Sequence, residues 1–139
     1  MKDIKTILHV EDDSIDVMST KRAFKALNFD CEIIHAKNGM EGINYLLNED
    51  NKKPQLILLD LNLPLMNGFE FLDEKNKIES LKIIPTVIFS TSTSEQDRLD
   101  AYKRGVAGYM VKPMSYEGFV EKLKYFIDYW KINEIPYFD

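Results

Sequence analysis

Short apolar runs alternate with longer amphipathic segments five times along the chain, and this alternation limits the folds it can adopt. The runs predict strands over residues 4–10, 31–36, 56–59, 86–89 and 107–111. The third run, Leu56-Ile57-Leu58-Leu59, has no polar residue, as is typical of a strand buried on both faces. Strands interleaved with helices form parallel sheets that helices cover on both sides. The pattern therefore predicts a doubly wound α/β fold.

The segments between the runs predict helices, and the last three lie over about 69–78, 95–104 and 116–130. Gly105 is well placed to end the helix over 95–104. Helical spacing predicts three inward-facing stripes: Ile15, Met18, Phe24 and Leu27; Met40, Ile43, Leu46 and Leu47; and Tyr116, Phe119, Val120, Leu123, Phe126, Ile127 and Trp130.

Composition excludes several classes of protein. The 139 residues suit one domain, and 45% hydrophobic with 29% charged residues is typical of a soluble globular protein. The net charge of −5, without a basic cluster, argues against nucleic-acid binding. We expect no membrane span or signal peptide, because apolar runs are short. The single cysteine, Cys31, suits a reducing compartment, so we expect a cytoplasmic protein.

Polar residues stand where the predicted strands end. Glu11-Asp12-Asp13 follows the first strand, Asp60 the third, Ser90 the fourth and Lys112 the fifth. Ligands of open α/β sheets bind beyond the carboxyl ends of the strands, so these groups should converge. Clustered carboxylates repel one another, and Mg²⁺ relieves that repulsion. A cation, a lysine and a hydroxyl around a carboxylate suit phosphoryl transfer, with Asp60 as the nucleophile.

Four motifs carry a resemblance to a known family. They are Ile7-Leu8-His9-Val10-Glu11-Asp12-Asp13, Leu59-Asp60-Leu61-Asn62-Leu63-Pro64-Leu65-Met66-Asn67-Gly68, Val87-Ile88-Phe89-Ser90-Thr91-Ser92 and Gly108-Tyr109-Met110-Val111-Lys112-Pro113. In this order, each at a strand end, they resemble the receiver domain of two-component response regulators, over about residues 6–130. The resemblance implies a CheY-like, flavodoxin-like three-layer (βα)5 fold with strand order 2-1-3-4-5.

The resemblance also implies a phosphorylation site. Asp60 would be the phosphoacceptor and, with Glu11, Asp12 and the backbone carbonyl of Asn62, would bind Mg²⁺. The family needs two acids where this chain has three. We assign the metal pair to Glu11 and Asp12 and place Asp13 near the following helix N-terminus, where its charge is favourable. The alternative, in which Asp13 replaces Glu11, stays open.

Three further residues match the family's switching apparatus. Ser90 takes the position of the switch hydroxyl, which binds a phosphoryl oxygen. Lys112 takes the position of the lysine that contacts the phosphoryl group. Tyr109 takes the position of the aromatic residue that moves inward on activation. The protein would catalyse its own phosphorylation and dephosphorylation, without being an enzyme that turns over a separate metabolite.

The resemblance implies protein partners. A sensor histidine kinase would donate the phosphoryl group, and a histidine phosphotransfer protein is a candidate recipient. The aromatic final helix and the Ile-Pro ending are similar to stand-alone regulators paired with bacteriophytochrome-type kinases. We therefore divide the chain into a receiver domain, 1–132, and an extension, 133–139. We expect a homodimer through the extension and the face formed by segments 95–104, 107–111 and 116–130.

Other interpretations use the same residues. A haloacid-dehalogenase-like phosphatase also forms an aspartyl phosphate, but it has a second Asp where this chain has Asn62. A flavodoxin-like electron carrier would have a phosphate-binding loop after the first strand, where this chain has acids. The remaining alternative is a receiver-like interaction module that works without phosphorylation.

Overall fold

A parallel five-stranded sheet forms the centre of the protein, whose computed structural model describes residues 4–136. The strands are β1 (Thr6–Val10), β2 (Glu32–Ala36), β3 (Leu56–Leu59), β4 (Thr86–Ser90) and β5 (Gly108–Val111). Their order is β2-β1-β3-β4-β5, and all neighbours pair in parallel. The predicted fold class and strand order are therefore confirmed.

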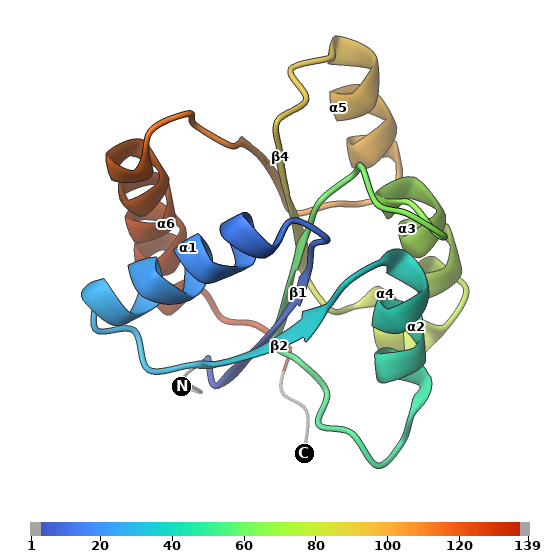
Figure 1. Cartoon of the computed structure of the whole chain (residues 1–139). Coiled ribbons are helices and arrows are strands. Elements are labelled where there is room, and N and C mark those ends of the chain that lie inside the picture. The colour runs from blue at the N-terminus through green and yellow to red at the C-terminus, as the bar shows by residue number, and fades with distance from the viewer. Residues whose placement is uncertain (1–3, 137–139) are drawn as a thin grey trace.

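Helices cover both faces of the sheet (Figure 1). On one face lie α1 (Ser14–Ala26) and α6 (Tyr116–Lys131). On the other lie α2 (Gly39–Leu47), α3 (Gly68–Asn76), the one-turn helix α4 (Glu79–Lys82) and α5 (Glu95–Lys103). The sequence pattern predicts a helix over about 69–78 and none over 79–82, so it missed the short helix α4. Among residues 4–136, no helix is long and apolar enough to cross a lipid bilayer.

The register of the sheet aligns the strand ends that matter for function. Val10 pairs with Leu59, and Leu59 pairs with Ile88. Glu11 and Asp60, the next residues after these partners on β1 and β3, therefore start side by side. Between β4 and β5, Ser90 pairs with Val111, which is the residue before Lys112. The carboxyl edge of the sheet thus collects the polar residues that the sequence places after each strand.

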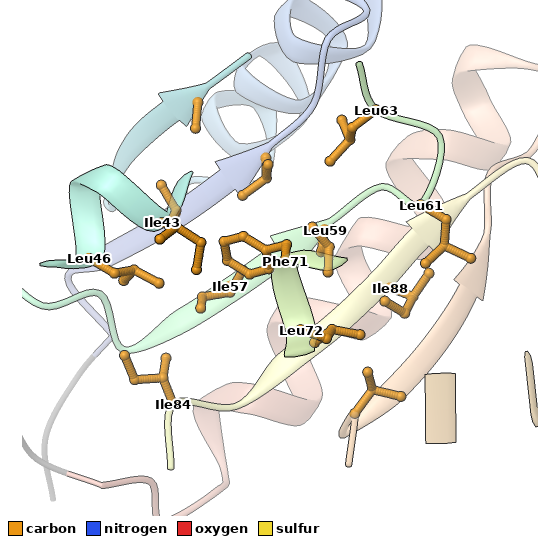
Figure 2. Packing of buried hydrophobic residues seen from close by; sticks show 14 of the residues in the cluster. Ile43, Leu46, Ile57, Leu59, Leu61, Leu63, Phe71, Leu72, Ile84 and Ile88 are labelled. Carbon is orange, nitrogen blue, oxygen red and sulfur yellow. The ribbon is translucent and has the colours of Figure 1, made fainter. Parts of the chain in front are cut away.

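The core has one layer on each side of the sheet. Between the sheet and α2 and α3, the ring of Phe71 lies among aliphatic side chains that include Ile57 and Leu59 (Figure 2). On the opposite face, residues of α1 and α6 such as Phe24 and Phe126 pack against Ile7 and Leu58. Because a helical layer covers each face of the sheet, the strands are mostly apolar on both faces.

The predicted inner stripe of α1 is partly wrong. Ile15 and Met18 are 71% and 63% exposed, whereas the buried residues are Val17, Thr20, Ala23 and Phe24. Both sets fit a helical repeat, so spacing alone does not fix which face turns inward. The packing of α1 against the sheet and α6 buries Ala23 and Phe24, and it turns Ile15 and Met18 outward.

The other two stripes are also buried only in part. In α2, Ile43 and Leu46 are buried, but Met40 and Leu47 are exposed because Gly39 and Gly42 occupy the close contact. In α6, the buried residues are Phe119, Leu123, Phe126, Ile127 and Trp130. Gly105 has φ +84° directly after the last residue capping α5, as predicted for a glycine that ends a helix.

Gly68 lets the first turn of α3 pack directly on the backbone beside Asp60. A Cβ at Gly68 would lie 2.6 Å from the carbonyl oxygen of Asp60 and 2.8 Å from the Cα of Leu61. Both atoms are backbone, so they cannot move aside without shifting the end of β3. The absence of a side chain at Gly68 therefore sets the position of the loop that follows Asp60.

Gly68→Ala should lower the free energy of unfolding by roughly 2 kcal/mol, in the range of overpacked cores. Gly108→Ala is the matched control, because its Cβ would meet only Val87 side-chain atoms, at 3.7 and 3.9 Å. Urea unfolding followed by circular dichroism measures both variants. Equal stability of the two would show that the loop adapts to a side chain.

Lys75 of α3 is a buried cation whose side chain reaches the end of α4. Only 3% of it is exposed, and its ammonium donates to the carbonyl oxygen of Lys82 at 3.1 Å. Burial lowers the pKa of Lys75 from 10.5 to about 8. Between those values the unfolded chain holds more protons than the folded chain, so stability rises with pH across this window.

Lys75→Met should remove that contribution. As the pH rises from about 8 to about 10.5, the free energy of unfolding of the wild type should increase relative to that of the variant. The reason is that only the wild type has a lysine whose pKa differs between the folded and unfolded states. Urea titrations at several pH values measure it. Parallel stability curves for the two proteins would contradict the assignment.

Candidate functional site

Three carboxylates meet at the carboxyl edge of the sheet. One oxygen from each of Glu11, Asp12 and Asp60 lies within 4.8 Å of the other two. Glu11 and Asp12 follow β1, and Asp60 follows β3. Glu11 and Asp60 are buried, while Asp12 is exposed. Such a group of hard oxygen ligands, one of them open to solvent, fits a divalent cation.

Lys112 brings a positive charge to the same place from β5. Its ammonium lies 2.5 Å from Glu11 Oε1, 2.7 Å from Asp16 Oδ2 and 3.3 Å from Asp60 Oδ2. The residue is 9% exposed. A buried ammonium needs such partners, because an unpaired charge in the interior is strongly unfavourable.

Burial and pairing pull the pKa values of this group in opposite directions. Burial raises the pKa of Glu11 to about 7, although the hydrogen bond from Lys112 opposes the rise. Burial disfavours the charged form of Lys112, but the bonds to Asp16 and Glu11 outweigh burial and raise the lysine pKa. The ammonium therefore stays charged at neutral pH, while burial makes the Glu11 carboxylate bind a proton more readily than an exposed glutamate would.

Backbone groups orient the two buried carboxylates. Asp60 Oδ1 accepts a hydrogen bond from the Leu61 N–H at 2.7 Å, which leaves Oδ2 toward Lys112. Glu11 Oε2 accepts from the Asp13 N–H at 3.1 Å. The backbone carbonyl oxygen of Glu11 is bonded to the His35 ring at 2.7 Å. Both side chains are therefore held from more than one direction.

Asp13 lies outside this group of carboxylates. It is the N-cap of α1, and its Oδ1 accepts from the N–H groups of Ile15 and Asp16 at 2.9 and 3.3 Å. The predicted place of Asp13 at the helix N-terminus is thus confirmed. This position of Asp13 agrees with the assignment of the metal pair to Glu11 and Asp12. The metal-binding role of Glu11 and Asp12 stays a prediction.

Ser90 and Tyr109 are linked through a third residue, Ser92. The Ser90 side chain is fully buried, and its Oγ accepts from the Ser92 N–H at 3.2 Å. The Tyr109 hydroxyl donates to the Ser92 carbonyl oxygen at 3.0 Å. Ser92 Oγ in turn donates to Asp97 on α5 at 2.7 Å. A shift of Ser90 would therefore reach both Tyr109 and α5 through one residue.

The sequence analysis did not identify two residues that contribute to the site, Asp16 and His35. Asp16 looks like an ordinary acidic residue in the first turn of a helix, and its lysine partner is 96 residues away. His35 lies inside a strand, and nothing in its neighbours indicates a bond to the carbonyl of Glu11. Asn62 is exposed in the loop after Asp60, and the metal role of its carbonyl stays a prediction.

The sheet order and the grouping of acids, lysine and hydroxyl at its carboxyl edge together define a receiver domain. The family profile described as "Response regulator receiver domain" matches residues 7–124. The chain therefore belongs to the response regulator receiver family, whose members serve two-component signalling.

Relatives span most of the chain. The probable methanogenesis regulatory protein FilR2 of Methanothrix harundinacea is 37% identical over 127 residues, which is 89% of this chain and 82% of that protein. Response regulator Rcp1 of a Synechocystis species is 32% identical over 130 residues, 91% of this chain and 88% of that protein.

Two solved structures match at 31% identity. The Mn²⁺-bound form of Rcp1 has a TM-score of 0.89 and covers 96% of this chain and 99% of its own. The phosphorylated cyanobacterial phytochrome response regulator RcpA has a TM-score of 0.91 and covers 97% of this chain and 100% of its own. The chain is thus homologous to phytochrome response regulators.

Proposed function

We propose that this protein accepts a phosphoryl group on Asp60 from a histidine kinase, in a reaction that needs Mg²⁺, and then changes its protein-binding surface. The observation that carries the proposal is the position of Asp60. Its carboxylate lies with those of Glu11 and Asp12 and also faces the Lys112 ammonium. A nucleophile beside a metal-binding acid pair and a fixed cation suits phosphoryl transfer.

The transfer exchanges one bond to phosphorus for another. A carboxylate oxygen of Asp60 attacks the phosphorus of the kinase's phosphohistidine, the new O–P bond forms, and the N–P bond breaks. The electron pair of the broken bond stays on the histidine nitrogen, which can then take up a proton. Mg²⁺, held by Glu11, Asp12, Asp60 and the Asn62 carbonyl, would neutralise phosphoryl oxygens, and the Lys112 ammonium would stabilise them further.

The switch would begin with the added charge of about −1.5 to −2 that a phosphoryl group brings. Ser90 Oγ would leave the Ser92 N–H to bind a phosphoryl oxygen. Because Ser92 also holds the Tyr109 hydroxyl and Asp97 of α5, its movement would release both. Tyr109, which already packs against the core, would move inward and alter the surface of α5, β5 and α6.

The partners follow from the family and from the surface. Rcp1 and RcpA support a phytochrome-type kinase as donor, because RcpA is described as a phytochrome response regulator. Exposed apolar side chains follow β1, β3 and β5, namely Ile15 and Met18 of α1, Leu65 and Met114. They suit a kinase that must approach Asp60. A histidine phosphotransfer protein would use the same approach, and the reaction would take place in the cytoplasm.

Incubation with acetyl phosphate tests the acceptor. The wild type with Mg²⁺ should gain about 80 Da in intact mass, the adduct expected of an aspartyl phosphate. Asp60→Asn should gain nothing, and neither should the wild type with a chelator. Asp13→Asn is the matched control and should react, because asparagine also caps helices. A magnesium-independent adduct, or one that persists in Asp60→Asn, would contradict the proposal, and no adduct would favour the phosphorylation-independent module.

A homodimer through α5, β5 and α6 is the second part of the proposal. Tyr125 and Tyr129 of α6 are 62% and 55% exposed, whereas Trp130 is buried. The two tyrosines line a groove of about 260 Å³ next to β5. In the described part of the extension, residues 133–136, Ile135 packs against the core of its own chain, so α6 offers a larger apolar surface than these residues do. Residues 137–139 of the extension lie outside the described residues.

Replacing both tyrosines by glutamate should prevent dimerisation, because charged groups would have to be desolvated at the interface. Sedimentation velocity over a range of concentrations, with and without acetyl phosphate, measures the effect. Leu47→Glu on α2 is the control, since Leu47 is also exposed but lies on the opposite layer. A wild type that stays monomeric in both conditions would contradict the dimer.

A further inference from the structure

Lys112 has a carboxylate partner for which the proposed phosphorylation provides no role. Its ammonium lies 2.7 Å from Asp16 Oδ2, closer than the 3.3 Å that separates it from Asp60 Oδ2. With Glu11 at 2.5 Å, Lys112 faces three carboxylates, which matches the three N–H donors of an ammonium. Asp16 is therefore one of three main partners of the lysine that is to contact the phosphoryl group.

The orientation of Asp16 is not explained by helix capping. At the start of α3, Glu70 occupies the equivalent position and accepts from the Asn67 N–H, which closes a capping box. At the start of α1, the Asp13 N–H donates to Glu11 instead. The Asp16 carboxylate is thereby left to Lys112, while its backbone carbonyl accepts from Thr20 Oγ1 at 2.8 Å.

Asp16 also stands apart from the acids that fit a metal. The carboxylates of Glu11, Asp12 and Asp60 form that group, and Asp16 does not belong to it. Glu11 and Asp60 thus have two competing uses, since both face the Lys112 ammonium and both would ligate a cation. Because the ammonium lies nearer to Asp16 than to Asp60, more of the Asp60 charge is left for the cation.

We propose that Asp16 is a positioning residue that holds the Lys112 ammonium at the α1 side of the site, away from Asp60, and so leaves the Asp60 carboxylate for a divalent cation. This inference rests on the proposed function. Once Asp60 carries a phosphoryl group, Lys112 would exchange a carboxylate partner for a phosphoryl oxygen, while Asp16 keeps the ammonium within the site.

Manganese titration of the full chain tests the role of Asp16, with free Mn²⁺ followed by electron paramagnetic resonance. Asp16→Asn and Asp13→Asn each remove one negative charge from the start of α1. Of these two carboxylates, Asp16 forms an ion pair with Lys112, whereas Asp13 caps the helix. Asp16→Asn should weaken Mn²⁺ binding at least about fivefold more than Asp13→Asn, as expected for groups that contact one another. Equal losses would overturn the inference.

A second background shows whether the effect passes through the lysine. In Lys112→Met, Asp16→Asn and Asp13→Asn should weaken Mn²⁺ binding equally, because no ammonium remains to be positioned. A specific loss that persists there would overturn the inference. Should Lys112→Met not fold, Asp16→Glu replaces it: the restored carboxylate should recover most of the affinity, and no recovery would overturn the inference.

A failure of the proposed function can be distinguished from a failure of this inference, because the two are measured in different experiments. It would appear as a wild type that takes up no phosphate from acetyl phosphate, whereas the manganese titrations compare variants without any transfer.

Discussion

The ammonium of Lys112 is the interaction on which the functional edge of this protein depends. It joins the end of β5 to the ends of β1 and β3 and to the first turn of α1. Without it, Glu11 and Asp60 would be two buried carboxylates facing each other, an arrangement that repulsion and desolvation both oppose. The ion pairs make an acidic site tolerable inside a folded chain, and they do so with a cation that can change partners.

The sheet provides the frame for this interaction. Because the order is β2-β1-β3-β4-β5, the acids after β1 and β3 are neighbours, and β4 lies between β3 and β5, the strand that Lys112 follows. The two helical layers bury both faces, so the carboxyl edge is the place where polar groups can gather. Signalling chemistry and hydrophobic packing therefore use different parts of the same strands.

Much of this arrangement could be predicted from the sequence, for a physical reason. A strand buried on both faces is a continuous apolar run, so the polar residue after it, such as Asp60, marks the sheet edge. The phase of α1 could not be predicted, because Ile15 and Val17 both fit a helical repeat and only packing against the sheet decides between them. Asp16 could not be predicted either, since its role comes from a contact with a residue far along the chain.

The long sequence separations in the site have a consequence for how the chain folds. Lys112 is 101, 96 and 52 residues away from Glu11, Asp16 and Asp60. Contacts of such range are costly in loop entropy and depend on the rest of the topology. While the chain is being synthesised, all three acids emerge before their lysine does. A nascent chain therefore has the three carboxylates but not the ammonium that pairs with them, and the complete site forms only after β5 has joined the sheet.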